Sequence, residues 1–233
     1  MKFKLNLTYL PKFFGAIILF LLVLNMVSLW IQHAVEEKRP LHDFFIRLFD
    51  FNQEANVPAF FSSLLLLMAS GLLFLIYFNK KKKNRKSIGW LGLALVFVFL
   101  SLDEATQIHE FLIGHSREYF DASGYLYYAW IIPYSAGLLL LALIYIPFFW
   151  RLDKKMLILM ILSGVIFIAG AIGMEMMGGN EINNSGFGLR YMIYYSVEET
   201  LEMIGVSIFI YSLIWYLSVK KNKITFKINP TTS

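Results

Sequence analysis

Hydrophobic residues are arranged along the chain in long runs, which short polar segments separate. Six runs are long enough, at about 1.5 Å of rise per residue, to cross a hydrocarbon core of roughly 30 Å as helices. They cover residues 13–32, 59–78, 88–114, 126–150, 156–177 and 189–219. Because the runs are continuous, unlike the short alternating strands of a membrane β-barrel, they predict an all-α, multi-pass membrane protein. We expect one six-helix bundle over residues 1–219, followed by a basic polar tail at 220–233.

The longest polar connection lies between the first two runs and contains one further helical pattern. Leu41–Phe51 carries hydrophobic residues at helical spacing. This pattern predicts a short amphipathic helix that lies on the membrane surface. Asn52–Pro58 then forms a polar turn that leads into the second span.

The basic residues are segregated along the chain. Sixteen of the 21 lysines and arginines lie before residue 13, within 79–87, within 151–155 and after 219. Six spans place all four segments on one side of the membrane, and positively charged loops favour the cytoplasmic side. We therefore predict cytoplasmic termini and a location in the cell inner (plasma) membrane. The pI of about 9.2 is explained by this orientation signal, so the lipid bilayer is the expected partner and nucleic acid is not.

The composition agrees with a membrane protein and excludes several kinds of functional site. The chain is 58% hydrophobic and its mean hydropathy is +0.61, both far from the values of ordinary soluble proteins. It contains no cysteine, which excludes disulfides, thiolate metal ligands and a cysteine nucleophile.

Two acidic blocks interrupt the third and sixth runs. Ser101–Glu110 reads SLDEATQIHE, and Ser196–Glu202 reads SVEETLE. An ionised acid in mid-membrane costs about 2.5–3.5 kcal/mol, so six of them would cost roughly 15–20 kcal/mol, more than the typical net stability of about 5–15 kcal/mol. These groups must therefore be protonated, hydrated, paired or bound to metal, and they indicate a functional site.

Ideal-helix geometry predicts which residues of the two blocks face each other. On a helix over 88–114, one polar arc contains Asp103, Thr106, Gln107, His109 and Glu110, whereas Glu104 points elsewhere. On a helix over 189–219, one stripe contains Tyr191, Tyr194, Tyr195, Glu198 and Glu202, whereas Glu199 points off it. Gly205 lies below this stripe and would allow close helix approach. Asp103 and Glu202 lie roughly 15–20 Å below the outer ends of these helices, which predicts an outward-open crevice.

Carboxylates together with an imidazole suit a divalent cation such as zinc, iron or manganese. The leading hypothesis is therefore a metal-dependent membrane enzyme, for which hydrolysis is one candidate reaction. The expected ligands are Asp103, His109, Glu110, Glu198 and Glu202, and Glu104 or Glu199 would be the general base on metal-bound water. The expected supporting residues are Gln107, Glu175, Tyr191 and Tyr195. Neither Glu-x-x-His nor HExxH is present in the blocks.

Two other functions would use the same acids. A proton- or cation-coupled transporter would use them as a relay, and a non-catalytic structural or assembly protein would use them as a hydrogen-bonded network. A relay should continue as polar residues through the inner halves of the spans. Those halves are nearly all apolar in the third and sixth runs, which favours a one-sided site, while the reaction and substrate stay open.

Overall fold

The computed structural model describes residues 7, 9–37, 39–80 and 85–220, and all regular structure in these residues is helical. Six helical stretches are long and apolar enough to cross a membrane. They are α1 (Tyr9–Ala34), α3 (Val57–Phe78), most of α4 (Arg85–Thr106), α6 (Ile131–Phe149), the continuous stretch Lys154–Ser185, and nearly all of α9 (Leu189–Lys220). The all-helical class is thereby confirmed, and so is the number of helical stretches that are long and apolar enough to span a membrane.

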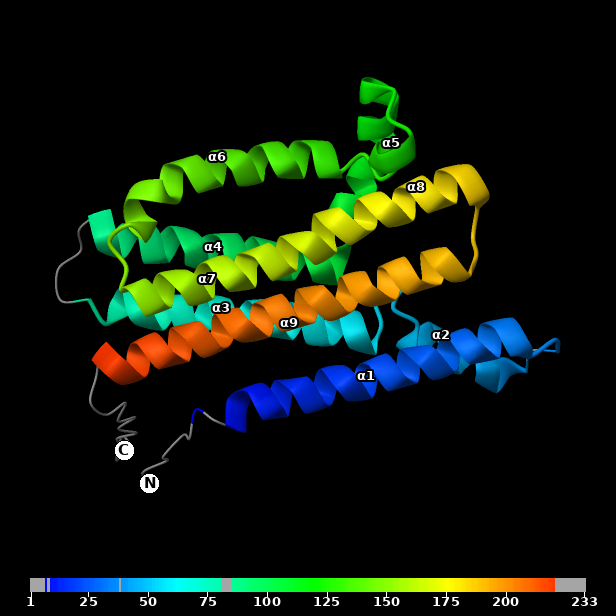
Figure 1. Ribbon diagram of the computed structural model, residues 1–233, viewed down its shortest axis with the longest axis horizontal. Helices are drawn as coiled ribbons and strands as arrows, with labels where there is room; N and C mark the ends of the chain where they lie inside the picture. The colour runs from blue at the N-terminus through cyan, green and yellow to red at the C-terminus, as the bar shows by residue number, and fades with distance from the viewer. Residues whose placement is uncertain (1–6, 8, 38, 81–84, 221–233) are drawn as a thin grey trace, which may run out of the picture.

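The long helices lie side by side along one common direction (Figure 1). Helix α9 is central, because it packs against α1, α3 and the Lys154–Ser185 stretch. Half of the apolar stretch of α9 is buried, against 17% of that of α6. The core contains fully buried Leu73, Trp90, Met203 and Ile210, so the protein interior is built around α9.

A short helix occupies the long polar connection, as the sequence predicts. Helix α2 (Pro40–Phe49) starts with Pro40 in its first turn, where the missing N–H of proline costs no hydrogen bond. Its Leu41 and Phe44 side chains are exposed. Its position at a membrane surface stays a prediction. The predicted tail lies, from residue 221 onwards, outside the described residues, as does part of the basic loop at 81–84.

The predicted third span, 88–114, is wrong at its C-terminal end. Helix α4 ends at Thr106, Gln107 adopts a left-handed conformation with φ 61°, and α5 (Ile108–Phe120) leaves in a different direction (Figure 1). A left-handed residue ends the α-helical hydrogen-bond pattern, and the Asp103 carboxylate accepts the backbone N–H of His109 at the start of α5. The single polar arc is therefore incorrect. Asp103 lies three residues, about 5 Å, from the end of α4, not 15–20 Å below a longer helix.

The fourth and fifth spans also differ from the predicted bounds. Helix α6 begins at Ile131, after the short 3-10 helix η1 (Gly124–Leu126). The fifth span continues through α7 (Lys154–Ile168), the π-helix η2 (Ala169–Met174) and α8 (Glu175–Ser185), although glycine and asparagine at 178–188 predicted a turn. Packing overrides that preference, because Gly178 and Gly179 lie against Tyr191 and Tyr128.

Candidate functional site

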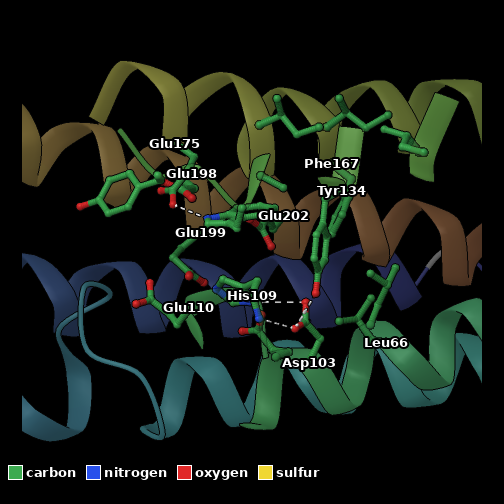
Figure 2. A pocket seen from close by; sticks show the side chains of 18 of the residues that line it. Leu66, Asp103, His109, Glu110, Tyr134, Phe167, Glu175, Glu198, Glu199 and Glu202 are labelled. Carbon is green, nitrogen blue, oxygen red and sulfur yellow. Dashed lines mark hydrogen bonds and ion pairs between the residues drawn. The ribbon is translucent and has the colours of Figure 1, made fainter. Parts of the chain in front are cut away.

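A cavity of ≈ 610 Å³ lies between α3, α4, α6, the Lys154–Ser185 stretch and α9. Its acidic wall, defined by its carboxyl side chains, consists of Glu54, Asp103, Glu104, Glu110, Glu175, Glu198, Glu199 and Glu202. His109 is the one basic side chain among the described residues of the lining. The apolar wall includes Leu66, Leu93, Phe97, Leu141 and Phe167. Figure 2 shows Leu66 and Phe167 on the side of the cavity away from Glu110. The two blocks of the sequence thus meet in one cavity.

Asp103 and His109 form the centre of the acidic wall. Asp103 is 6% exposed, and its Oδ1 accepts hydrogen bonds from the Tyr134 hydroxyl (3.0 Å) and from the backbone N–H of His109 (2.9 Å). Its Oδ2 lies 3.3 Å from His109 Nδ1, and His109 Nε2 lies 3.6 Å from Glu54 Oε1. Burial lowers the pKa of His109, but the two carboxylates outweigh burial and raise it to about 11. Without a metal ion, a pKa of about 11 favours the imidazolium form of this half-buried ring between the two carboxylates.

Glu54 reaches the cavity from the loop between α2 and α3. The Asn25 side chain accepts a hydrogen bond from the backbone N–H of Phe51 (3.0 Å). The Asn52 side chain accepts one from the Tyr191 hydroxyl (2.7 Å). Side chains of α1 and α9 therefore fix a loop that would otherwise be mobile, and they hold Glu54 above His109.

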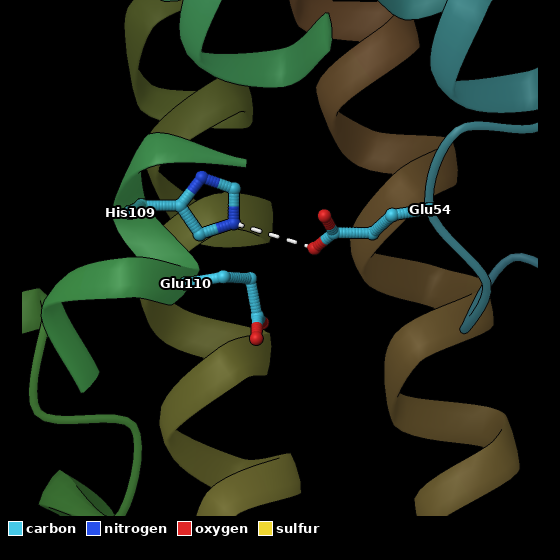
Figure 3. Close-up of side chains that lie close together, drawn as sticks. All are labelled: Glu54, His109 and Glu110. Atoms are coloured by element: carbon cyan, nitrogen blue, oxygen red, sulfur yellow. Dashed lines mark ion pairs between the residues drawn. The ribbon is translucent and has the colours of Figure 1, made fainter. Parts of the chain in front are cut away.

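One group of ligand atoms is compact enough for a metal ion. Glu54, His109 and Glu110 each offer an atom, and all three atoms lie within 4.8 Å of one another (Figure 3). Glu110 is the exposed member of this group, and its partial loss of hydration, together with the neighbouring charge of Glu54, raises its pKa. The second carboxylate oxygen of Glu54 is buried and has no hydrogen-bond partner among the described residues. Such an atom is costly unless something binds it.

The acids of α8 and α9 form the opposite side of the acidic wall. Glu175 accepts a hydrogen bond from Trp130 Nε1 (3.0 Å), and its side chain is also hydrogen-bonded to Glu198. Two carboxyl groups make such a contact only with a proton or a cation between them. Glu199 Oε2 is buried and has no hydrogen-bond partner among the described residues. Glu202 completes the set (Figure 2).

Two glycines bring the fifth span and α9 close together beside these acids. A Cβ on Gly170, in the π-helix, would lie 2.8 Å from the backbone oxygen of Glu198 and 3.1 Å from Glu202 Cγ. A Cβ on Gly205 would lie 2.8 Å from the backbone nitrogen of Phe167. The close approach predicted at Gly205 is therefore present.

The structure brings together nearly all of the residues singled out in the sequence. Those that line the cavity are Asp103, Glu104, His109, Glu110, Glu175, Tyr191, Tyr195, Glu198, Glu199 and Glu202. Glu104 and Glu199, expected to point away, belong to this set. Gln107 does not, because it forms the break between α4 and α5, and Thr106 is exposed.

Sequence reasoning missed Glu54, Tyr128, Trp130 and Tyr134, all of which line the cavity. Glu54 gave a weak signal, because it lies in the polar turn on the same predicted side of the membrane as the acidic blocks. The aromatic residues gave none, since tyrosine and tryptophan near membrane interfaces are common without any role in a site.

The negative charge of the acidic wall has little compensation from side chains. Arg117 donates two hydrogen bonds to the backbone oxygen of Tyr127, at 2.7 and 3.0 Å, and stacks over its ring. Arg190 is exposed. Neither residue lines the cavity. Protons or cations must therefore balance most of the carboxylates.

The chain belongs to a family of unknown function. The family model described as "Domain of unknown function (DUF8692)" matches residues 15–217, which includes all of the acidic wall. Comparison with curated proteins and with solved structures finds no match.

Proposed function

We propose that this member of the DUF8692 family is a metal-dependent membrane enzyme whose reaction is a hydrolysis. The observation that carries the proposal is the clustering of ligand atoms from Glu54, His109 and Glu110 within 4.8 Å, on a wall without lysine or arginine among its described residues. Zinc, iron and manganese accept such ligands. Metal bonds of about 2.0–2.2 Å would require ligand atoms roughly 3.4 Å apart in a tetrahedral site, so the most distant pair would have to approach by up to about 1.4 Å.

Asp103 fits a positioning role beside this cluster. It accepts a hydrogen bond from the Tyr134 hydroxyl at Oδ1 and faces His109 Nδ1 through Oδ2. A carboxylate on one ring nitrogen fixes the histidine tautomer and leaves the other nitrogen free for a metal ion. In this arrangement Asp103 orients His109 Nε2 toward the cation rather than binding the cation itself.

The remaining acids supply the other parts of the proposed chemistry. A bound divalent ion lowers the pKa of a coordinated water and so provides a nucleophile at neutral pH. Glu199, whose buried Oε2 has no partner among the described residues, is the favoured base for the proton of that water. Glu104, which interacts electrostatically with His109 and Glu54, is the second candidate base. Glu198 and Glu202, on the opposite side of the acidic wall, remain proposed metal ligands.

The proposed orientation places this chemistry at the outer leaflet of the inner (plasma) membrane. The distribution of basic residues supports cytoplasmic termini, and the amphipathic sequence of α2 supports a position at the outer membrane surface. A transporter would need a polar path past the acidic wall to the other side. The deeper wall of the cavity is apolar instead, which supports an enzyme with a one-sided site in a single six-helix bundle.

Metal analysis of the purified protein tests the proposal. Protein in lipid nanodiscs should carry near-stoichiometric zinc, iron or manganese. Glu54→Gln, His109→Gln and Glu110→Gln should each lose it, whereas Glu118→Gln, which changes an exposed carboxylate on the same helix α5, should retain it. A chelator should lower the Tm of the wild type, because a ligand that binds only the folded state stabilises it. Metal-free wild-type protein with a chelator-insensitive Tm would refute the metal-dependent function.

A further inference from the structure

The deeper half of the cavity is apolar and lies where lipid chains would lie. The wall of the whole cavity on α4 extends from apolar Leu93 up to Glu104 of the acidic wall, eleven residues apart, which corresponds to about 16 Å of helix. That length is close to half of a hydrocarbon core of roughly 30 Å, the depth of one leaflet. The cavity volume of ≈ 610 Å³ lies within the range of about 300–1,000 Å³ typical of ligand sites.

Two glycines leave open space on this apolar wall. Gly137 of α6 and Gly164 of α7 both line the cavity, and an added Cβ on either would meet no atom within 4 Å. Glycines at a tight helix contact look different, as the 2.8 Å approach at Gly205 shows. The space between α6 and α7 is therefore room that side chains do not fill.

Helix α6 is joined only weakly to the rest of the protein. Among the described helices it packs substantially on α4 alone, and its residues Leu139, Leu140 and Leu143 are exposed. Residues of α6 and α7 line the same cavity although the two helices do not pack closely together. In a bilayer, hydrocarbon is the medium that meets such an opening.

We infer that the apolar half of the cavity holds the hydrocarbon chain of a membrane lipid, and that the head of this lipid lies at the acidic wall. A lipid is then the substrate class of the enzyme, a conclusion that rests on the proposed function. The described lining offers no lysine or arginine to an anionic head. Like charges disfavour one another at short range, so the head is zwitterionic or neutral.

A photoreactive lipid tests the inference directly. The wild type is placed in nanodiscs that contain phosphatidylcholine with a diazirine in its acyl chain, irradiated, and mapped by peptide mass spectrometry. Labels should appear at Phe97, Leu141 and Phe167 inside the cavity, as well as at exposed lipid-facing residues. A phosphatidylglycerol probe with the same chain should give severalfold weaker cavity labels at equal exterior labelling.

Leucine substitutions at the open glycines separate cavity lipid from surface lipid. Gly164→Leu and Gly137→Leu should reduce the cavity labels severalfold and leave exterior labels unchanged. Gly71→Leu is the matched control, because this glycine of α3 also has nothing within 4 Å of an added Cβ and does not line the cavity. The two test glycines lie on different helices, so either variant alone is decisive if the other misfolds.

The outcomes for lipid and for metal are distinguishable in the same samples. Metal content should be the same in all three leucine variants, because Gly137 and Gly164 lie on the apolar wall and Gly71 lies outside the cavity. Wild-type protein that binds metal without any cavity label, or cavity labels that neither test variant reduces, would overturn the lipid inference alone. Cavity labels in wild-type protein that never carries metal would support the lipid site and overturn the metal-dependent function, and the lipid would then be no metalloenzyme substrate.

Discussion

Replacing Asp103 by asparagine should disrupt the proposed metal site through the tautomer of His109. The Oδ1 atom of Asp103 accepts hydrogen bonds from the Tyr134 hydroxyl and the backbone N–H of His109. These two donors should hold the asparagine oxygen in the same place. The amide NH₂ then replaces Oδ2, which lies 3.3 Å from His109 Nδ1. Two donors cannot face each other, so Nδ1 should lose its proton and Nε2 should carry it.

The expected size of this effect follows from the position of Asp103 behind the histidine. Removing such an outer partner typically lowers metal affinity by about 10–100-fold, which corresponds to about 1.4–2.8 kcal/mol. Tyr134→Phe is the matched control, because it removes one donor to Asp103 and keeps the carboxylate on Nδ1. Its cost should be about 0.5–1.5 kcal/mol of stability, with little change in metal affinity.

Competition with a chromophoric chelator would measure the affinities, and ¹⁵N NMR of labelled histidine would report the tautomer. Wild-type affinity in Asp103→Asn would refute the positioning role of Asp103. Complete loss of metal, equal to that in Glu110→Gln, would instead favour Asp103 as a direct ligand, as the sequence alone had suggested.

Four further results are expected. With chelator present, the Tm of the wild type should exceed that of His109→Gln most below the unfolded histidine pKa of about 6.5, and the difference should shrink as pH rises toward the folded pKa of about 11, because the carboxylates stabilise only the protonated ring. A difference that does not change with pH would exclude the ion pairs. Asn25→Leu should cost about 1–3 kcal/mol of stability and weaken metal binding, because it leaves the backbone N–H of Phe51 unpaired. Unchanged metal content would show that this loop does not position a metal ligand. Gly205→Ala should cost about 1–3 kcal/mol by overpacking, and an unchanged Tm would disprove the close helix contact. A reporter fused after Lys154 should report cytoplasm and one near Asp121 the outside; the reverse would invert the orientation.

The six helices that are long and apolar enough to span a membrane could be predicted because apolar length is a local property of the sequence. The end of α4 could not, because it depends on partners distant in the chain. Gln107 is left-handed, and no glycine or proline at that position announces a break. The Asp103 carboxylate caps the start of α5 while Tyr134 of α6 holds it in place. The bond between Asp103 and His109 spans only six residues, whereas the Tyr134 hydroxyl that holds the carboxylate comes from a different helix. A continuous helix through Gly114 was therefore the reasonable reading of an apolar run.

The contribution of Glu54 depends on tertiary structure in the same way. Its loop is polar and irregular, and nothing in its sequence shows where it folds. Its place above His109 follows from hydrogen bonds to Asn25 of α1 and Tyr191 of α9. Residues from three distant parts of the chain must therefore be in place before the ligand cluster exists.

Glu104 and Glu199, which the ideal-helix projection placed off the polar face, show that the cost of exposing a carboxylate to lipid outweighs its angle on the helix. Glu198 and Glu199 are adjacent and about 100° apart on α9, yet both line the cavity. Each acid facing lipid would cost about 2.5–3.5 kcal/mol, whereas α9 is surrounded by α1, α3 and the Lys154–Ser185 stretch and has more than one interior face. A helix with several carboxylates therefore becomes the central helix, and the cavity extends around it. The cost of each acid, rather than its angle on a helical projection, predicts that all of them belong to the site.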